Sequence, residues 1–164
     1  MTAQAEMKAI RIHQFGGSEV LRYESAPIPQ AADDEILIKV AATAYNPVDL
    51  AMRSGYLQQI FSHEFPYIPN IEVSGTVKAS GAAVSGFKPG DNVYAFLDMS
   101  KDGAAAEYVT TKAEFASLAP TNISLADAAA LPVGALTAWQ GLFEHGRLAA
   151  GQRVLIAGAA GGGG

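Results

Sequence analysis

The sequence predicts a mainly β fold that leads, near its C-terminal end, into the beginning of an α/β unit. Up to residue 120, short segments that alternate apolar and polar residues are separated by glycine and proline, the pattern of strands joined by turns. After residue 120, two helical patterns precede an apolar run and a glycine-rich segment. This order is typical of α/β domains, so we expect a domain boundary between residues 120 and 126.

Composition restricts the class of protein. The 164 residues are enough for one domain, or for one domain and the start of another. A net charge of −5 without a basic cluster argues against a nucleic-acid or membrane partner. The chain has no cysteine, which excludes disulfides and cysteine-containing zinc or redox motifs. It begins without the basic and apolar regions of a signal peptide, so a cytoplasmic protein is expected.

Two short strands are expected near the N-terminus. Residues 1–6 are predicted to be a disordered leader, because the first strand-like pattern begins at Met7. Residues 8–14 and 20–23 are predicted to be strands on either side of a Gly-Gly-Ser turn. Residues 26–29, Ala-Pro-Ile-Pro, are predicted to be an extended connector, since proline cannot donate a hydrogen bond to a ladder.

The strongest strand pattern covers residues 35–44. Ile36, Ile38 and Val40 share one face, and the residues between them give the other face some apolar character, as expected in a closed barrel. A later strand contains Gly75, and a glycine inside a strand usually marks a bulge or a close approach of backbone. The further predicted strands cover residues 72–79, 93–96, 105–111 and 115–118.

Local signals predict three helices. Asn46 is a candidate N-cap, Pro47 takes the first helical position, and Gly55 is a candidate left-handed residue at the end. A second, short helix is expected after Ser124, whose hydroxyl can cap it. A longer helix over residues 132–145 has apolar residues close to helical spacing.

The last residues combine an apolar run with a glycine motif. Residues 154–157 have the composition of a buried parallel strand. The G-x-x-G-x-x-G spacing that follows suits a loop in which backbone approaches a pyrophosphate before a helix N-terminus that binds the anion. A flexible glycine-rich tail is the alternative that the motif alone leaves open. The candidate cofactor-binding residues are Gly158, Ala159, Gly161, Gly162, Gly163 and Gly164.

Nine segments resemble, in order and spacing, the medium-chain dehydrogenase/reductase superfamily, and in particular its zinc-independent quinone oxidoreductases and alkenal/enone reductases. This resemblance implies a GroES-like β-barrel catalytic domain over residues 7–125. It also implies the start of a Rossmann NAD(P)-binding domain over residues 126–164, truncated relative to the family. The segments are AYNPVD at 44–49, RSG at 53–55, FPYIP at 65–69, VSGTV at 73–77, FKPGD at 87–91, AAEYV at 105–109, AAALP at 128–132, LTAW at 136–139 and the glycine motif.

The sequence departs from this family's zinc-binding branch. That branch places a cysteine at the position of Asn46 and a histidine at that of Ile71 to hold the catalytic metal. Neither asparagine nor isoleucine is a good zinc ligand, so no metal site is expected. Gly163 stands where the family usually has an apolar residue, and we have no functional account of this difference.

The resemblance also implies site residues. Asn46 and Tyr56 would have catalytic roles, and Tyr45, Asn46, Pro47 and Thr137 would lie near the cofactor. Each has an alternative: Asn46 is equally suited to being only a helix cap. Tyr56 could instead pack on the barrel wall, and Thr137 could be an ordinary helix residue.

Other polar residues are given structural roles. Glu72 is predicted to form an ion pair, with Arg53 as a plausible partner, and Asp49 is predicted to be a first-turn helix residue rather than a proton relay. The histidines show neither metal-ligand nor triad spacing; they are His13, His63 and His145.

The implied function is NADPH-dependent hydride transfer to quinones or α,β-unsaturated carbonyls without zinc. A conjugated acceptor spreads its developing negative charge, so one or two hydrogen-bond donors can replace a Lewis acid. The alternatives are a non-catalytic GroES-like binding or structural module and an alcohol dehydrogenase-like ketone reductase. The 164-residue chain alone is expected to be inactive, and the full-length protein is a candidate homodimer.

Overall fold

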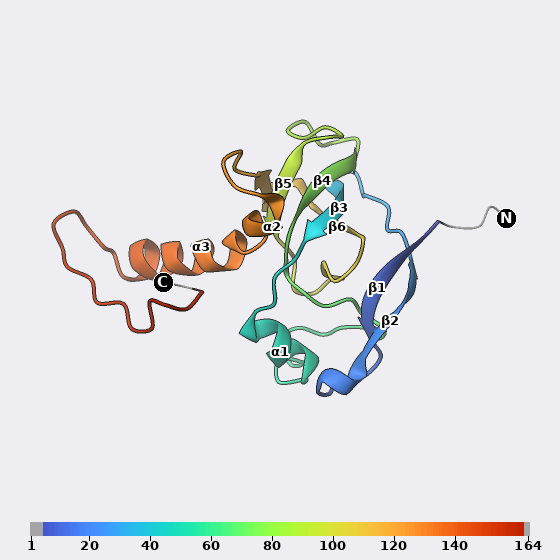
Figure 1. Ribbon diagram of the computed structural model, residues 1–164, viewed down its shortest axis with the longest axis horizontal. Coiled ribbons are helices and arrows are strands. Elements are labelled where there is room, and N and C mark those ends of the chain that lie inside the picture. Colours follow the sequence, from blue (N-terminus) through green and yellow to red (C-terminus); the bar gives the residue numbers. More distant parts are fainter. Residues whose placement is uncertain (1–4, 163–164) are drawn as a thin grey trace.

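Two antiparallel sheets form the body of the protein (Figure 1). The computed structural model describes residues 5–162. One sheet has two strands, β1 (Glu6–Ile12) and β2 (Leu21–Pro27). The strands of the other are β3 (Glu35–Ala42), β4 (Glu72–Ser80), β5 (Asn92–Phe96), β6 (Tyr108–Lys112) and β7 (Ala116–Leu118). They follow the spatial order β6-β3-β4-β5-β7.

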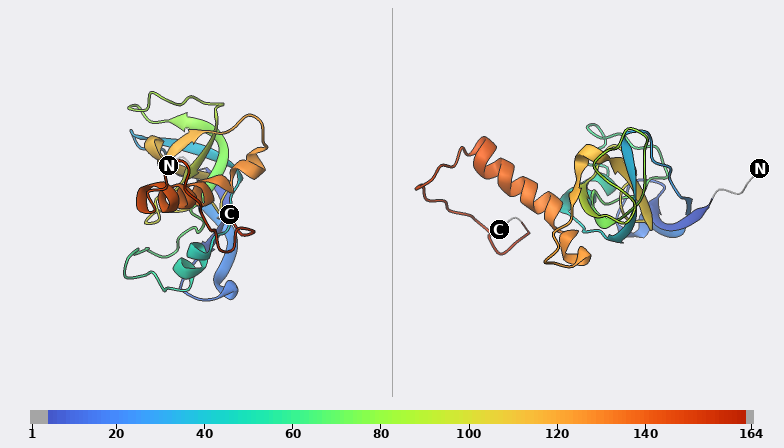
Figure 2. Two further views of the ribbon diagram at one scale, coloured as in Figure 1. Left: turned by 90° about the vertical axis from the view of Figure 1, so that its left-hand side faces the viewer. Right: turned by 90° about the horizontal axis from the view of Figure 1, so that it is seen from above.

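The main core lies inside the larger sheet, which curls around it (Figure 2). Ile36 and Ile38 on β3, Val73 and Val77 on β4, and Val93 on β5 are fully buried. Side chains alternate between the two faces of a strand, so residues two or four positions apart point into the same core. This arrangement agrees with the barrel that the apolar pattern of β3 predicts.

The two-stranded sheet lies against the body through isolated bridges. Ala9 pairs with Ala106, and Ile12 pairs with Tyr67. A small apolar cluster fills the space beneath this sheet, and its buried members are Met7, Ala9, Ala26 and Ile68. The N-terminal strands are therefore part of the domain and not an appendage.

The structure corrects two predictions at these strands. β1 already includes Glu6, which pairs with Pro27, so the predicted leader is wrong at this residue; residues 1–4 lie outside the described part. The predicted connector over residues 26–29 is wrong at its start, because β2 continues through Pro27. Proline is tolerated at the end of an edge strand, where no neighbouring strand needs its N–H. Burial of Ala26 opposite Met7 favours the longer pairing.

Gly75 on β4 permits a close approach of backbone. It lies opposite Val40 on β3, where the register shifts between Val40 and Ala42. A Cβ atom on Gly75 would lie 2.2 Å from the carbonyl oxygen of Lys39. The prediction of a bulge or close contact at this glycine is confirmed.

The first two α-helices begin at the residues that the local signals indicate. α1 (Pro47–Arg53) follows Asn46 at the N-cap, and Gly55 has a φ of +83° just beyond its end. α2 (Leu125–Ala128) is capped by Ser124, whose Oγ accepts the backbone N–H of Asp127 at 3.1 Å. Single 3-10 turns are η1 (Ser18–Val20) and η2 (Ala113–Phe115).

The last helix projects from the barrel. α3 (Leu131–Trp139) continues into the π-helical segment η3 (Gln140–His145), and both extend away from the sheets (Figures 1 and 2). Trp139 and Phe143 contact each other on this arm, with ring centroids 4.7 Å apart. Across residues 5–162, we find no helix with the length and apolar character needed to span a membrane.

The strand expected over residues 154–157 is not formed. These residues have no regular structure, and Leu155 is 97% exposed. A parallel strand depends on neighbouring strands and on helices that cover its faces, and the described residues supply neither around this run. The segment instead loops back toward α3, where the carbonyl oxygen of Gly162 lies 2.7 Å from the position of a Cβ on Gly134 (Figure 1).

Candidate active site

Asn46 is held between the end of β3 and the start of α1. Its backbone is extended (φ −112°, ψ 158°), and its N–H donates to the Asp49 carboxylate at 2.7 Å. The preceding connection is fastened to β4 by Thr43, whose Oγ1 donates to the backbone oxygen of Glu72 at 2.6 Å. The N-cap position predicted for Asn46 is confirmed, and Asn46 and Asp49 form a capping box at the start of α1.

The side-chain amide of Asn46 binds Glu72. Nδ2 of Asn46 donates to Oε1 of Glu72 at 2.7 Å, while Oε2 of Glu72 accepts the backbone N–H of Val133 at 2.9 Å. Glu72 is only 1% exposed. One carboxylate therefore joins the residue before α1, the first residue of β4 and the first turn of α3.

The ion pair predicted between Glu72 and Arg53 is wrong. Among residues 5–162, no lysine, arginine or histidine nitrogen lies within 4.0 Å of the Glu72 carboxylate. The N-terminus of α3, with its partial positive charge, and the Asn46 amide occupy the two oxygens instead. Val133 escapes sequence reasoning because a backbone N–H leaves no residue-type signal.

A second buried carboxylate lies in α1. Asp49 is 2% exposed; Oδ2 accepts the Asn46 N–H, and Oδ1 has no hydrogen-bond partner in the described structure. Burial raises the pKa of Asp49, and the negative charge of Glu72 acts in the same direction. The nearby phenol of Tyr67 is also without a partner, and burial raises the pKa of Tyr67 to about 12. Asp49 is thus a first-turn helix residue, as predicted, in a poorly solvated setting.

We expect Asp49→Asn to change the pH dependence of stability. A carboxyl with a raised folded-state pKa binds its proton more tightly in the native protein, so native stability rises as pH falls through that pKa. The melting temperature of the wild type minus that of Asp49→Asn should therefore increase from neutral toward acidic pH. Thermal unfolding at a series of pH values measures this difference.

Glu35→Gln provides the matched control with the opposite sign. Burial acts to raise the pKa of Glu35, but hydrogen bonds from the Ala32 N–H and the Lys101 ammonium lower it overall. Stabilisation by this carboxylate is lost as pH falls, so the corresponding difference for Glu35→Gln should shrink. Parallel pH profiles for the two variants would contradict the assignment of Asp49.

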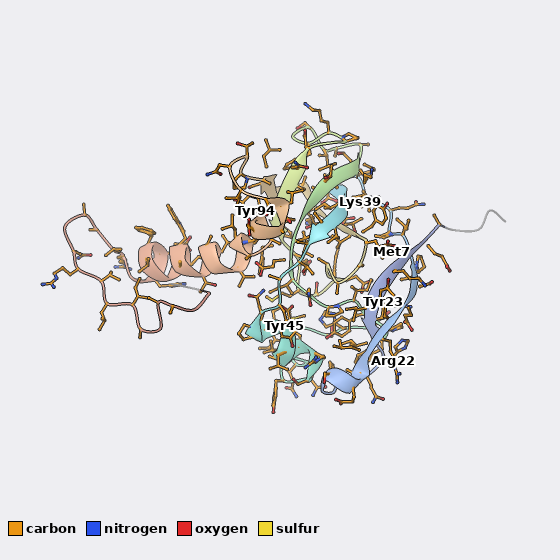
Figure 3. All side chains as sticks on the ribbon, in the orientation of Figure 1. Met7, Arg22, Tyr23, Lys39, Tyr45 and Tyr94 are labelled. Atoms are coloured by element: carbon orange, nitrogen blue, oxygen red, sulfur yellow. The ribbon has the colours of Figure 1, made fainter. Side chains whose placement is uncertain are left out.

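The remaining predicted residues lie at the surface. Tyr45 is exposed on the turn before α1 (Figure 3), and Pro47 and Thr137 are also exposed. Tyr56 is 85% exposed, so it does not pack on the barrel wall as its alternative role required. The structure thus brings Asn46 together with Glu72 and the start of α3, and it leaves these other candidates exposed. Gly163 and Gly164 lie outside the described residues.

The cavity between the barrel and α3 is apolar. It has a volume of about 450 Å³ and is lined by residues of β5, the β6–β7 region and α3. Tyr94, labelled in Figure 3, and Trp139 are among its walls. None of the predicted site residues lines it, so we do not assign the substrate to this cavity.

Residues 5–162 fit a dinucleotide only in part. Gly158 has a φ of +75°, and the N–H of Gly161 donates to its carbonyl oxygen at 2.9 Å, which closes a tight turn. A pyrophosphate cradle needs a strand before this turn and a helix after it, and residues 146–161 show neither. Within residues 5–162, no group of three or more histidine, aspartate or glutamate side chains could hold a metal ion.

Comparison with known proteins identifies the family. The model of the alcohol dehydrogenase GroES-like domain matches residues 32–121. A chloroplastic quinone-oxidoreductase homolog of Spinacia oleracea is 38% identical over 95% of this chain and 49% of its own length. A chloroplastic NADPH-dependent alkenal/one oxidoreductase of Arabidopsis thaliana is 39% identical over 96% of this chain and 42% of its own.

A solved structure is similar to this chain as well. A mycobacterial protein complexed with NADPH superposes with a TM-score of 0.77 and 33% identity, over 88% of this chain and 43% of that one. The chain therefore spans about half the length of the relatives it matches. The curled sheet, with α1 docked beside it, defines a GroES-like domain. The chain belongs to the quinone oxidoreductase and enone reductase branch of the medium-chain dehydrogenase/reductase superfamily, as its sequence motifs predict.

Proposed function

We propose that this chain supplies the substrate-binding half of an NADPH-dependent reductase that acts on quinones or α,β-unsaturated carbonyls without zinc. The observation that supports this most directly is the fixed amide of Asn46, which stands where the zinc branch has a cysteine. The names of the relatives from Spinacia oleracea and Arabidopsis thaliana point to the same substrates, and the Arabidopsis name to the same cofactor.

The residues of the chain would stabilise negative charge on the substrate oxygen and position the substrate and the cofactor. When bound, NADPH supplies the hydride. The second Nδ2 hydrogen of Asn46 and the hydroxyl of Tyr56 are the proposed donors to the substrate oxygen, on which negative charge develops. We assign Tyr45, Pro47 and Thr137 to the cofactor side of the site. The proposed contacts with the pyrophosphate come from Gly158, Ala159, Gly161, Gly162, Gly163 and Gly164, within a domain that begins at residue 126.

A chimera tests this function. It joins this chain to the nucleotide-binding half of the Spinacia oleracea relative, starting where the similarity ends. We expect the chimera to oxidise NADPH with a quinone or an enone, to ignore saturated ketones, and to keep its rate in EDTA. Loss of activity in EDTA would favour a zinc-dependent alcohol dehydrogenase instead. A folded chimera that binds NADPH but reduces neither substrate class would favour a non-catalytic module.

The chain without that added half is expected to bind NADPH weakly. Residues 146–161 form neither the strand nor the helix that a complete pyrophosphate site needs, so few backbone N–H groups of the described residues can face one pyrophosphate. We expect its dissociation constant to exceed that of the chimera by about 100-fold or more, a loss of roughly 3 kcal/mol of binding free energy. Titration followed by nicotinamide fluorescence measures both constants, and micromolar binding by the chain alone would contradict this prediction. Cytoplasmic location and homodimerisation remain further parts of the proposal.

A further inference from the structure

We propose that Glu72 is a positioning residue that holds Nδ2 of Asn46 against its carboxylate and so fixes the orientation of the Asn46 side-chain amide. The hydrogen bonds of Glu72 carry this inference, and its catalytic consequence rests on the function proposed above. The geometry is a property of residues 5–162 and can be tested without turnover.

A carboxylate can select one orientation of an amide. An ionised carboxylate accepts hydrogen bonds and donates none, whereas an asparagine amide has a donor end and an acceptor end. Oε1 of Glu72 lies 2.7 Å from Nδ2 of Asn46, so the nitrogen must face the carboxylate. Oδ1 then points away from Glu72, and it is the acceptor that the capping box of α1 requires for the Asp49 N–H.

Glu72 itself has no freedom to turn. Its second oxygen accepts the N–H of Val133, in the first turn of α3, at 2.9 Å. The residue before it in that helix, Pro132, has no N–H to offer. At 1% exposure, Glu72 has almost no access to solvent that could replace either partner. Both oxygens are thus committed, one to Asn46 and the other to the helix that leads toward the nucleotide-binding half.

The groups around Glu72 favour this arrangement over an ion pair. The structure described for residues 5–162 shows no cation within salt-bridge distance of the carboxylate, and the other acid beside the site, Asp49, accepts the backbone N–H of Asn46. The Asn46 residue therefore meets a carboxylate at its backbone and another at its side chain. The side-chain contact requires a nitrogen donor, so the amide cannot reverse without breaking its charge-assisted hydrogen bond to Glu72.

Glu72→Gln should reverse the amide. Glutamine offers one acceptor and one donor, and the Val133 N–H needs the acceptor, so the new NH2 group must face Asn46. Asn46 then turns by about 180° to present Oδ1 to the introduced glutamine, and its own NH2 group moves from Glu72 toward the first turn of α1. The double variant Asn46→Asp with Glu72→Gln restores a hydrogen bond between the two positions but has no NH2 group at position 46.

Nuclear magnetic resonance of the chain detects this reversal directly. The Asn46 side-chain NH2 pair, assigned by its absence in Asn46→Ala, should show one shifted proton protected from solvent exchange in the wild type. In Glu72→Gln the pair should lose this shift and exchange faster, because the hydrogen bond to the buried carboxylate is gone. Glu35→Gln, which changes a buried glutamate on the same sheet with other partners, should leave the pair unchanged. An Asn46 pair unaffected by Glu72→Gln would overturn the proposal.

The chimera adds the catalytic readout. We expect Glu72→Gln to lower kcat by about 10- to 100-fold with a smaller change in KM, because the NH2 group leaves the place from which it donates to the substrate oxygen. The double variant has no NH2 group at position 46 and should not recover this loss. Reversal of the amide with an unchanged kcat would overturn the positioning role. A chimera without any activity, in which the NH2 pair still reverses, would instead contradict the proposed function while supporting the geometry.

Discussion

Asn46→Ala is expected to lower kcat/KM of the chimera for an enone by about 100- to 1,000-fold, the usual cost of losing one donor to a developing oxyanion. The substitution removes the only side chain that donates to the Glu72 carboxylate within residues 5–162. Without that donor and without a metal, the substrate oxygen depends on conjugation alone to carry its charge. Steady-state rates at several enone concentrations measure the effect.

Stability must be separated from activity in this variant. Loss of the Asn46 amide leaves one oxygen of a buried carboxylate without a partner, which costs on the order of 1–3 kcal/mol. Urea unfolding of Asn46→Ala measures that cost independently of the rate. Ser54→Ala at the opposite end of α1 is the matched control, since its hydroxyl bonds only the Leu50 carbonyl within that helix, and its activity should stay unchanged. An Asn46→Ala rate within about threefold of the wild type, on a folded chimera, would refute the role of the amide.

Gly75→Ala should produce a large loss of stability. The added Cβ would lie 2.2 Å from the Lys39 carbonyl oxygen and 2.6 Å from Cγ2 of Ile38, and both atoms belong to the neighbouring strand β3. To relieve these two contacts, β3 and β4 would have to move apart, although both strands carry fully buried side chains. We expect a loss of about 3 kcal/mol in the free energy of unfolding and a fall in Tm of about 10 °C.

A second glycine controls for the intrinsic effect of alanine. Gly86 lies in a loop, has no atom within 4 Å of a potential Cβ, and has no positive φ. Gly86→Ala should therefore be neutral or slightly stabilising, because alanine reduces the freedom of the unfolded chain. Equal melting temperatures for the two variants would show that β3 and β4 adjust without cost.

Features that depend on neighbouring residues could be predicted from the sequence. The cap at Ser124 and the turn at Gly55 follow from hydroxyl and glycine chemistry within a few positions. The position of Gly75 inside a strand predicted its contact with the next strand. Asn46 could be predicted both as a helix cap and, through the family motif, as a site residue, and its geometry leaves room for both roles.

Features that depend on partners distant in the sequence could not be predicted from the sequence. The contact between Glu72 and Val133 joins residues 61 positions apart, and its donor is a backbone group present in every residue except proline. The predicted partner Arg53 was chosen by charge, although an uncharged helix end satisfies the same carboxylate. The apolar run at residues 154–157 has strand composition, but composition does not supply the neighbouring strands that such a run needs.

The double use of Glu72 has a consequence for the evolution and engineering of this site. A change at position 46 alone must still provide a donor toward position 72, and Asn46→Asp would bring two carboxylates within hydrogen-bond distance of each other. Productive mutational paths should therefore alter the two positions as a pair. Libraries that seek new substrates by saturating position 46 while keeping Glu72 would sample mostly defective proteins, and combinatorial variation of both positions opens the larger set of functional sequences.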